Sequence, residues 1–412
     1  MNFNTWFCEL QTRTAEHAGA GLVAFGRLLA RLQHPQNHYK IIHVAGTNGK
    51  GTVCTLLAHV LTCAGHKTGL FVSPHLISPT ERIQLNGQEI SEEDFRQAVQ
   101  TVLDAQEEPL NFFELITAAA LVYFAAQQAQ YVVLETGLGG RKDPTNICTP
   151  VLSVITSVGL DHTHLLGGTL TQIAAEKAGI IKPGVPVLCG DVAPEAARVL
   201  EQAVLKNHAP LTWVREGQPF YEYAYDFVNG STALHTADRC EWELHLIGSK
   251  QTQNACLVYQ AARQLGVDEQ SIKTAFETVQ LPGRFERIRH DNTTFILDGA
   301  HNPPAVQALV GFWQKTPYAL QQSVLLCGFM KDKDFKTMLR TLAPHFARII
   351  LTVPPSARAA TQADFGDLLH APNLIFEPDY HAALTLAQQA PVVLCTGSFY
   401  LVGAVKETLV KI

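Results

Sequence analysis

The stretch KIIHVAGTNGKGT, from Lys40 to Thr52, decides the fold. Its first six residues, Lys40 to Ala45, form the short β-branched apolar run that is typical of a buried strand. Val53 to Gly65, directly after it, is compatible with a helix. A glycine-rich loop between a strand and a helix is the setting of a phosphate site, because glycines let backbone N–H groups and the helix N-terminus face the phosphates. We therefore predict that this loop binds a nucleotide.

Each residue type in the loop has a use at such a site. Lys50 supplies a point charge for the phosphates, and Thr52 supplies a hydroxyl for Mg²⁺. The spacing departs from the general phosphate-loop pattern, since Gly51 separates Lys50 from Thr52. The alternative is a glycine-rich turn that caps a helix and exposes a lysine. The predicted ATP contacts are Gly46, Thr47, Asn48, Gly49, Lys50, Gly51 and Thr52.

The rest of the amino-terminal part predicts a mostly parallel sheet covered by helices. Short apolar runs alternate with helical patterns, as in α/β proteins. The predicted strands are Lys40 to Ala45, Thr68 to Ser73, Tyr131 to Thr136, Val151 to Ser157 and Val185 to Cys189. Tyr221 to Leu246 alternates aromatic and polar residues around the turn dipeptide Asn229-Gly230, which predicts antiparallel hairpins at the sheet margin. A helix is predicted from about Gln251 to Leu265.

A second series of strands and helices predicts a second domain. The segment Leu281-Pro282-Gly283-Arg284 interrupts the pattern, and 412 residues exceed what one core usually supports. The strands predicted after it are Thr294 to Leu297, Ser323 to Cys327, Ala347 to Val353 and Pro391 to Thr396. We predict two domains, residues 1–281 and 282–412.

Composition indicates a soluble, cytoplasmic enzyme. Hydrophobic residues make up 47% and charged residues 17%, and the net charge of −6 argues against a nucleic-acid partner. The nine scattered cysteines, several inside apolar runs, indicate reduced, buried thiols. Met1 to Ala20 lacks the layout of a secretory signal, and the most apolar stretch, Ile116 to Ala126, is too short to span a bilayer. We expect no membrane partner.

Three polar groups follow predicted strands and predict a metal site. They are Ser73, Glu135 and His162. The carboxyl ends of strands in an open parallel sheet line one crevice, so these groups should converge near the phosphate loop. Hydroxyl and carboxylate oxygens suit Mg²⁺, although imidazole is a less usual ligand. Taken singly, His162 fits a structural role and Glu135 fits a helix cap.

Lys177 stands inside the helical stretch Ile173 to Ile180, among apolar residues. A buried ammonium is costly unless it is paired or modified. The alternative is a lysine whose stem is buried while its amine reaches solvent.

The motifs together resemble the folylpolyglutamate synthase and dihydrofolate synthase family of the Mur ligase superfamily. They occur in the family's order over most of the chain. The matching segments are HVAGTNGKGT (43–52), SPHL with ER (73–82), ETGLGGRKDPTN (135–146), DHTHLLGGTL (161–170), EKAGIIKPG (176–184), PGRFE (282–286) and DGAHNP (298–303).

The resemblance implies an ATP-binding P-loop domain followed by a smaller Rossmann-like domain in a monomer. It implies that Thr52, Ser73, Glu135 and His162 serve two Mg²⁺ ions and that Lys177 is carbamylated and joins them. It places Asn254, Arg284 and Asp298 against ATP, and His301 and Asn302 beside the glutamate and phosphate sites. Three residues depart from the family's pattern: Lys142, Pro144 and Lys250. Lys142 bears on the loop near the metals or the pterin pocket, and Lys250 bears on the adenine-side contacts.

The implied reaction joins L-glutamate to the γ-carboxylate of tetrahydrofolate through an acyl phosphate, with Lys50 and Lys177 in the catalytic set. His301 is the candidate base for the amine, and a carboxylate-binding or helix-start role fits it equally. The first rival is dihydrofolate synthase activity on dihydropteroate, alone or in addition, which needs a pterin pocket around Ser73 to Arg82 and Phe112-Phe113-Glu114. The second is a P-loop ATPase without ligation, which leaves DGAHNP without a purpose.

Overall fold

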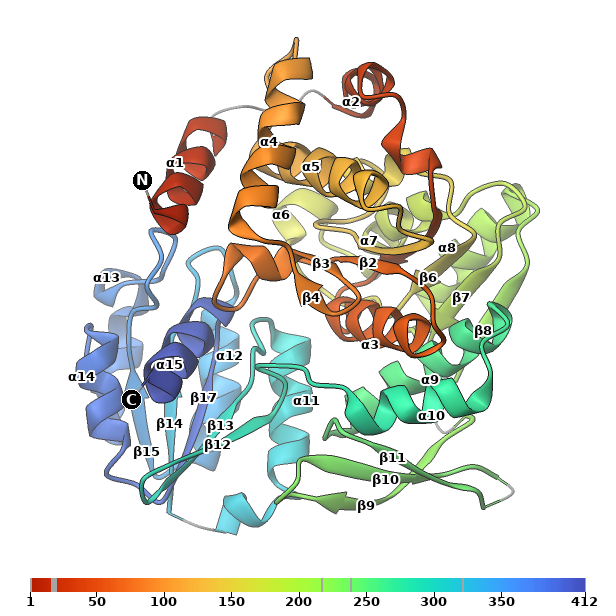
Figure 1. The fold of residues 1–412 in the computed structure, drawn as a ribbon. Helices are drawn as coiled ribbons and strands as arrows, with labels where there is room; N and C mark the ends of the chain where they lie inside the picture. The colour runs from red at the N-terminus through yellow and green to blue at the C-terminus, as the bar shows by residue number, and fades with distance from the viewer. Residues whose placement is uncertain (1, 16–20, 216–217, 238, 321, 412) are drawn as a thin grey trace.

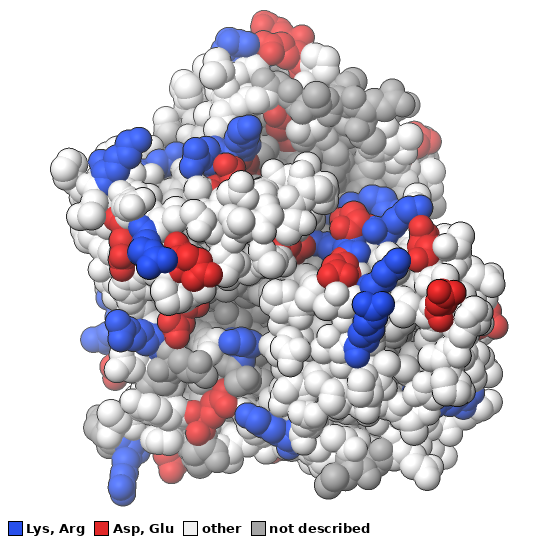
Figure 2. Space-filling model, turned by 180° about the vertical axis from the view of Figure 1, so that it is seen from behind, with Lys and Arg blue, Asp and Glu red and all other residues white. Residues whose placement is uncertain are grey.

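The structure is a computed structural model that describes residues 2–15, 21–215, 218–237, 239–320 and 322–411. Residues 1 and 16–20, which belong to the stretch examined for a secretory signal, lie outside the described residues. Among the residues that the structure describes, no helix is long and apolar enough to cross a membrane. On the face seen in Figure 2, basic and acidic side chains are intermingled.

An eight-stranded sheet in the order β4-β3-β2-β5-β1-β6-β7-β8 forms the amino-terminal part (Figure 1). All neighbours from β2 to β8 are parallel, and β3 and β4 extend one edge as antiparallel strands. The strands are β1 (Lys40–Ala45), β2 (Thr68–Phe71), β3 (Ile83–Leu85), β4 (Gln88–Glu89), β5 (Tyr131–Glu135), β6 (Leu152–Ile155), β7 (Val187–Gly190) and β8 (Leu211–Val214). The five predicted strands are confirmed; β3, β4 and β8 were not predicted.

Helices cover both faces of this sheet because successive strand residues point to opposite sides. Ile42 and Val44 of β1 pack in a core with α3, α9 and α10, whereas Ile41 packs in another core with α1, α2, α4 and α5. The helices are α1 (Phe3–Ala15), α2 (Gly21–Arg31), α3 (Lys50–Cys63), α4 (Glu92–Ala105), α5 (Phe112–Ala126), α6 (Thr163–Leu166), α7 (Leu170–Lys177), α8 (Pro194–Lys206), α9 (Ser249–Gln264) and α10 (Glu269–Thr278).

The predicted hairpins form a sheet of their own, in the order β11-β10-β9, so their placement at the margin of the large sheet was wrong. The strands are β9 (Tyr221–Asp226), β10 (Ser231–His235) and β11 (Glu241–Leu244). Their apolar side chains, such as Leu234 and Trp242, pack with α9 and α10, and none of the three strands pairs with β8 in the described residues. The predicted turn is present, and Gly230 adopts φ +73.

The turn between β9 and β10 reaches the carboxyl-terminal part. The Phe227 ring lies 6.2 Å from that of Phe312 and 6.0 Å from that of Tyr318. The Tyr318 hydroxyl donates to the Phe227 carbonyl over 2.9 Å, and Arg287 donates to the Val228 carbonyl over 3.3 Å. The small sheet therefore joins the two large ones.

The second large sheet has the order β12-β13-β17-β14-β15-β16 and is parallel except for β12 (Figure 1, teal to blue). Its strands are β12 (Glu286–His290), β13 (Thr293–Leu297), β14 (Ser323–Cys327), β15 (Arg348–Leu351), β16 (Leu374–Phe376) and β17 (Val392–Thr396). Its helices are α11 (Pro303–Trp313), α12 (Phe335–Leu342), α13 (Gln362–Phe365), α14 (Tyr380–Ala387) and α15 (Phe399–Lys411). The four predicted strands are confirmed; the edge strands β12 and β16 were not predicted.

Among the described residues, the nine cysteines form no disulfide. Cys8 and Cys240 are exposed and Cys63 is partly buried, so the prediction of burial fails for these three. The buried thiols are Cys54, Cys148, Cys189, Cys256, Cys327 and Cys395.

Candidate active site

The phosphate loop lies between β1 and α3, as predicted, and its shape depends on glycine. Gly49 precedes α3 with φ +85, and a Cβ on it would lie 2.5 Å from Asn254 Oδ1. A Cβ on Gly46 would lie 1.9 Å from Thr156 Oγ1. A side chain at either position would collide with Thr156, just after β6, or with Asn254 of α9, so both positions favour glycine.

Side chains just after β6 hold the loop. Ser157 Oγ accepts from the Asn48 amide over 2.9 Å, and Thr156 Oγ1 donates to the Asn48 carbonyl over 2.7 Å. Thr47 Oγ1 donates to the Gly159 carbonyl over 3.1 Å. The loop is thereby fixed in one conformation.

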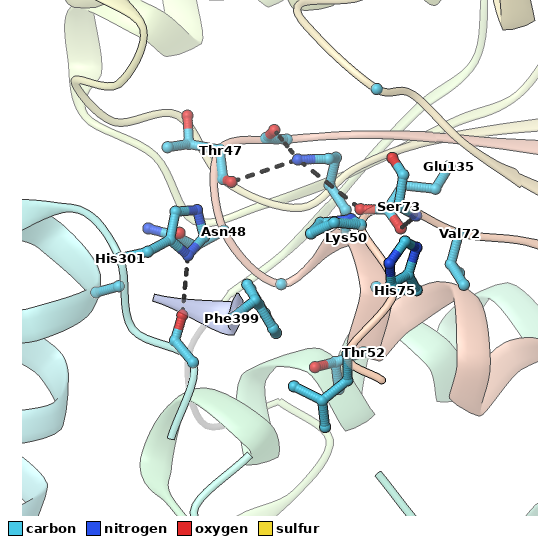
Figure 3. Close-up of a pocket in the computed structure, with 18 of the residues that line it drawn as sticks. Thr47, Asn48, Lys50, Thr52, Val72, Ser73, His75, Glu135, His301 and Phe399 are labelled. Carbon is cyan, nitrogen blue, oxygen red and sulfur yellow. Dashed lines mark hydrogen bonds and ion pairs between the residues drawn. The ribbon is translucent and has the colours of Figure 1, made fainter. Parts of the chain in front are cut away.

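Lys50, Ser73 and Glu135 come together from three segments (Figure 3). Lys50 Nζ donates to the Gly46 carbonyl over 3.1 Å and lies 3.9 Å from Glu135 Oε1. The Ser73 amide donates to Glu135 Oε2 over 3.1 Å. Burial raises the pKa of Glu135, and the Lys50 ammonium opposes that rise. Thr52, in the first turn of α3, is buried.

His162 contacts a residue that the sequence did not point to. Lys333 Nζ lies 2.6 Å from Asp161 Oδ1 and 2.9 Å from His162 Nε2. Burial alone would raise the pKa of Asp161, but the Lys333 ammonium outweighs it and holds the pKa at about 2. Burial, followed by the charge of Lys333, lowers the pKa of His162. The imidazole is therefore neutral near pH 7, with an Nε2 lone pair that faces a cation.

The donor set fits a divalent ion in chemical type. Glu135 offers carboxylate oxygens, Thr52 and Ser73 offer hydroxyls, and His162 offers the Nε2 lone pair. The Lys333 ammonium lies against Asp161 and His162 on this side of the site. Among the described residues, no three His, Cys, Asp or Glu side chains gather as a metal cluster. A metal here would depend on hydroxyls, on a modified lysine or on substrate oxygens.

Lys177 is 2% exposed at the end of α7, so its stem does not carry the amine to solvent. Burial, followed by the charge of Lys50, lowers its pKa from 10.5 to about 7. The Asp161 carboxylate charge opposes this fall in the pKa of Lys177. The amine is consequently neutral in a large fraction of molecules near pH 7, and neutral amines are nucleophilic.

Asn302 links the carboxyl-terminal part to the phosphate loop. Its Nδ2 donates to Asn48 Oδ1 over 3.0 Å and to Asp161 Oδ2 over 2.9 Å. Asn48 Nδ2 donates in return to Asn302 Oδ1 over 3.2 Å. Asn302 also caps α11, because its Oδ1 accepts from the Ala305 amide.

His301 and Arg284 face the cleft from the same side. His301 Nδ1 lies 2.9 Å from the Gly299 carbonyl; since a carbonyl only accepts, Nδ1 carries the proton and Nε2 the lone pair. Burial, followed by the charge of Lys333, lowers the pKa of His301 to about 4, so it is a weak base near pH 7. The Arg284 guanidinium stacks 4.6 Å from the Phe399 ring centre, and the Asp298 carboxylate opposes the burial-driven fall in its pKa.

An aromatic wall with one arginine lies farther along the cavity, within the region where a pterin pocket was considered. Arg82 Nε donates to His75 Nδ1 over 2.8 Å, and the guanidinium lies 5.8 Å from the Phe112 ring centre. Phe7 of α1 packs edge-on against Phe112 and His75, at 5.3 and 5.8 Å between ring centres. Nothing in the sequence pointed to α1 as part of this wall, because its residues match no motif.

The three departures from the family's pattern also line the cavity. Lys142 is exposed there, and Pro144 begins a short helical turn capped by Asp143. Lys250 is exposed and donates to Gln253 Oε1 over 2.9 Å. Gln251 Oε1 accepts from Asn254 Nδ2 over 3.1 Å, so the amide beside the loop keeps a partner.

One cavity of about 2150 Å³ is lined by the phosphate loop, Glu135, Lys177, His301 and the aromatic wall. It runs from the phosphate loop to the aromatic wall, and segments next to the strands of both large sheets contribute to its lining. Thr47, Asn48, Lys50, Ser73, Glu135 and His301 surround it in Figure 3. A nucleotide and a second, partly aromatic molecule therefore fit in one continuous space.

Comparison with known families and proteins agrees with this arrangement. Residues 44–262 match the Mur ligase middle domain, and residues 283–399 match the Mur ligase glutamate ligase domain. The dihydrofolate synthase/folylpolyglutamate synthase of Bacillus subtilis is 32% identical over 94% of this chain and 95% of its own length.

Solved structures show the same fold. Escherichia coli FolC in complex with DHPP and ADP is 30% identical, with a TM-score of 0.86 over 100% of this chain and 98% of that one. The bifunctional folylpolyglutamate synthase/dihydrofolate synthase of Yersinia pestis, complexed with AMPPNP and Mn ion, is 28% identical, with a TM-score of 0.83 over 99% and 98%. The chain belongs to the folylpolyglutamate synthase and dihydrofolate synthase family of Mur ligases.

Proposed function

We propose that this enzyme uses ATP to add L-glutamate to the γ-carboxylate of tetrahydrofolate, through an acyl phosphate. The observation that carries the proposal is the continuity of one cavity between the phosphate loop and the aromatic wall. Ligation needs this continuity, because the γ-phosphate must reach the carboxylate of the second substrate in line. A P-loop ATPase without ligation has no use for the second half of the cavity.

In the first step the folate carboxylate attacks the γ-phosphate of ATP, the bond from the γ-phosphorus to the bridging oxygen breaks, and ADP leaves. The amides from Gly46 to Thr52 and the Lys50 ammonium hold the phosphates and offset the charge that develops on their oxygens. Asn254, Arg284 and Asp298 surround the nucleotide from the far side of the loop. Arg82 holds the folate against Phe112, where a guanidinium suits both an aromatic face and a carboxylate.

The residues at the strand ends would hold a divalent metal. We assign two Mg²⁺ sites to Thr52, Ser73, Glu135, His162 and a carbamylated Lys177. When bound, Mg²⁺ neutralises phosphate charge and orients the attacking carboxylate. Lys177 suits carbamylation, because its pKa of about 7 leaves neutral amine to react with CO₂. The carbamate would convert a buried cation into an anionic ligand.

In the second step the neutral amine of L-glutamate attacks the acyl carbon, and phosphate leaves with the proton that the amine gives up. His301 lines the cavity, and its Nε2 carries the lone pair because Nδ1 donates to the Gly299 carbonyl. A pKa of about 4 favours a hydrogen bond that orients the attacking amine over full removal of its proton. Asn302 holds the two sides of the cleft together during the attack.

We further propose that residues 1–281 and 282–412 act as two domains of a cytoplasmic monomer. The two large sheets fall on either side of this boundary, and the free cysteines fit a reducing compartment. ATP, the folate and L-glutamate are then the partners of the chain, with no nucleic acid and no membrane.

A second candidate activity is dihydrofolate synthesis from dihydropteroate. The aromatic wall of Phe7, Phe112 and His75 could seat a pterin, and the relative from Bacillus subtilis carries both activities in its name. The exposed Lys142 beside Pro144 distinguishes this chain's cavity from the family's pattern.

The test is to incubate the protein with ATP, Mg²⁺ and L-glutamate, with tetrahydrofolate in one reaction and dihydropteroate in another. ADP release and the mass of the pterin product are followed. Added glutamate in the first reaction alone is the expected result, and product in both makes the enzyme bifunctional. Product in neither, with ATP bound to folded protein, overturns the folate assignment.

A further inference from the structure

The Lys333 ammonium crosses the cleft to lie between two side chains with the character of metal ligands. Lys333 stands in the segment between β14 and α12, whereas Asp161 and His162 follow β6 in the other large sheet. The Lys333 side chain is 8% exposed and that of Asp161 is 10% exposed, so solvent screens this ion pair little. The contact joins the two sides of the cleft at the reaction site.

The geometry at His162 identifies what Lys333 occupies. An ammonium can only donate, so His162 Nε2 contributes its lone pair to the 2.9 Å contact. A divalent metal would use the same lone pair. The His162 backbone adopts φ +48, and its amide donates to Asp161 Oδ1 over 2.8 Å, so the residue is held in place. Lys333 and a metal therefore cannot use Nε2 at the same time.

We propose that Lys333 is a displaceable internal cation that fills the metal position of His162 until a divalent ion replaces it. The inference rests on the metal assignment within the proposed function. It means that metal binding must break a buried ion pair, and that the segment from Lys331 to Asp334 is released from the Asp161 side when the ion arrives. Metal loading and the position of this segment are thereby linked.

Lys331 provides a matched control in the same segment. It is also a lysine, two residues away, but its ammonium pairs with Asp364 over 2.9 Å and its side chain is 68% exposed. Removing its charge changes the general field near the site without touching Asp161 or His162. Comparing the two lysines separates direct competition with the metal for His162 Nε2 from long-range repulsion of the metal by a nearby positive charge.

The experiment titrates Mn²⁺ alone, without nucleotide or folate, and measures free ion by electron paramagnetic resonance. Lys333→Met should bind Mn²⁺ about tenfold more tightly than the wild type, because no buried pair has to break. Lys331→Met should stay within about twofold, as expected for an exposed pair. Unchanged or weaker binding by Lys333→Met overturns the proposal.

Two further measurements guard against a folding defect and a misassigned ligand. In a His162→Ala background, Lys333→Met should no longer change Mn²⁺ affinity; a persistent tenfold gain would place the competition elsewhere. In the wild-type protein, Mn²⁺ should speed acylation of Lys333 by an amine-directed reagent at least about fivefold and leave Lys331 unchanged, because displacement exposes an otherwise unreactive buried amine. Slower or unchanged labelling of Lys333 contradicts displacement. None of these readouts uses folate or glutamate, so they stand apart from the test of ligase activity.

Discussion

The side-chain amides of Asn48 and Asn302 exchange two hydrogen bonds, of 3.0 and 3.2 Å, between positions 254 residues apart in the sequence. Asn48 belongs to the phosphate loop, and Asn302 caps α11 in the part of the chain that matches the glutamate ligase domain. Asn302 also donates to Asp161, so one buried amide holds the loop and the candidate metal region together. The position of the carboxyl-terminal part is therefore set directly by the loop that meets the phosphates.

We expect Asn48→Ala and Asn302→Ala to be coupled. Asn302→Ala should cost more in stability than Asn48→Ala, since it also removes the cap of α11, worth about 1 kcal/mol. A double-mutant cycle on the free energy of unfolding should give a coupling of about 0.5–3 kcal/mol. Additive effects within about 0.3 kcal/mol would show that the two amides act separately.

Lys50→Ala should abolish ligation and leave the fold intact. The Lys50 side chain is partly exposed and packs in no hydrophobic core, so the free energy of unfolding should change little. The phosphates of bound ATP, in contrast, would lose the ammonium charge that faces them. A loss in turnover of about 10²–10³-fold is expected from a group that offsets transition-state charge. Turnover and circular dichroism are measured together; an unchanged rate removes Lys50 from the phosphate site.

Gly46→Ala should weaken ATP binding at least about tenfold, because the new Cβ would meet Thr156 Oγ1 at 1.9 Å and displace the loop that presents its N–H groups. Gly311→Ala is the control. That glycine lies in the exposed part of α11 with nothing within 4 Å of the new Cβ, so alanine should stabilise the helix by up to about 1 kcal/mol. Calorimetric ATP titration and thermal unfolding distinguish the two outcomes; equal ATP affinity in both variants contradicts the steric argument.

Burial of Lys177 makes stability depend on pH in a defined direction. Its pKa falls from 10.5 to about 7 on folding. Between these values the unfolded chain holds a proton that the folded chain has released, so stability rises as pH increases. In CO₂-free buffer, Lys177→Met should flatten the rise of Tm between about pH 7 and 9.5. An equally steep rise in this variant would mean that another group causes it.

The carbamate makes a separate prediction at the same residue. Lys177→Ala should lose ligation, because the modified side chain can no longer contribute an oxygen to the metal. Short carboxylic acids added to the assay should restore part of the rate by placing a carboxylate in the vacated space. The mass of the intact wild-type protein, measured with and without CO₂, reports the modification independently of activity.

Arg82→Ala should raise the KM for the folate by about 10- to 100-fold, which corresponds to the charge-assisted contact that a buried guanidinium makes with a carboxylate. The KM for ATP should stay within about twofold, because Arg82 lies on the aromatic wall with His75 and Phe112. Initial rates at varied folate and varied ATP test the split. An equal rise in both constants would indicate general damage to the cavity.

Much of the fold could be predicted because local sequence decides it. The runs Lys40–Ala45 and Tyr131–Glu135 are apolar on both faces, as buried parallel strands require. The short edge strands β4 and β16 were missed, since two or three residues carry no readable period. The small sheet of β9 to β11 was placed wrongly because alternation predicts a strand and says nothing about which sheet it joins.

Some residues of the candidate site could also be predicted from the sequence, and others could not. Lys50, Ser73 and Glu135 could be brought together from strand ends, because topology alone places them at one edge. Lys333 and Phe7 could not. Both reach the cavity through packing between distant segments, and neither stands in a motif whose spacing marks a function. A lysine between two aspartates, as in Lys331-Asp332-Lys333-Asp334, looks like an ordinary solvated turn.

The β9–β10 turn contacts the carboxyl-terminal part at one end of β14. Tyr318, which holds the turn, lies just before β14, and Lys333 lies just after it, so the two sit toward opposite ends of the same strand. If the cleft opens by rotation about the end of β14 that the turn contacts, a residue moves farther the more distant it is from that end. Tyr318 would then move little and Lys333 would move more.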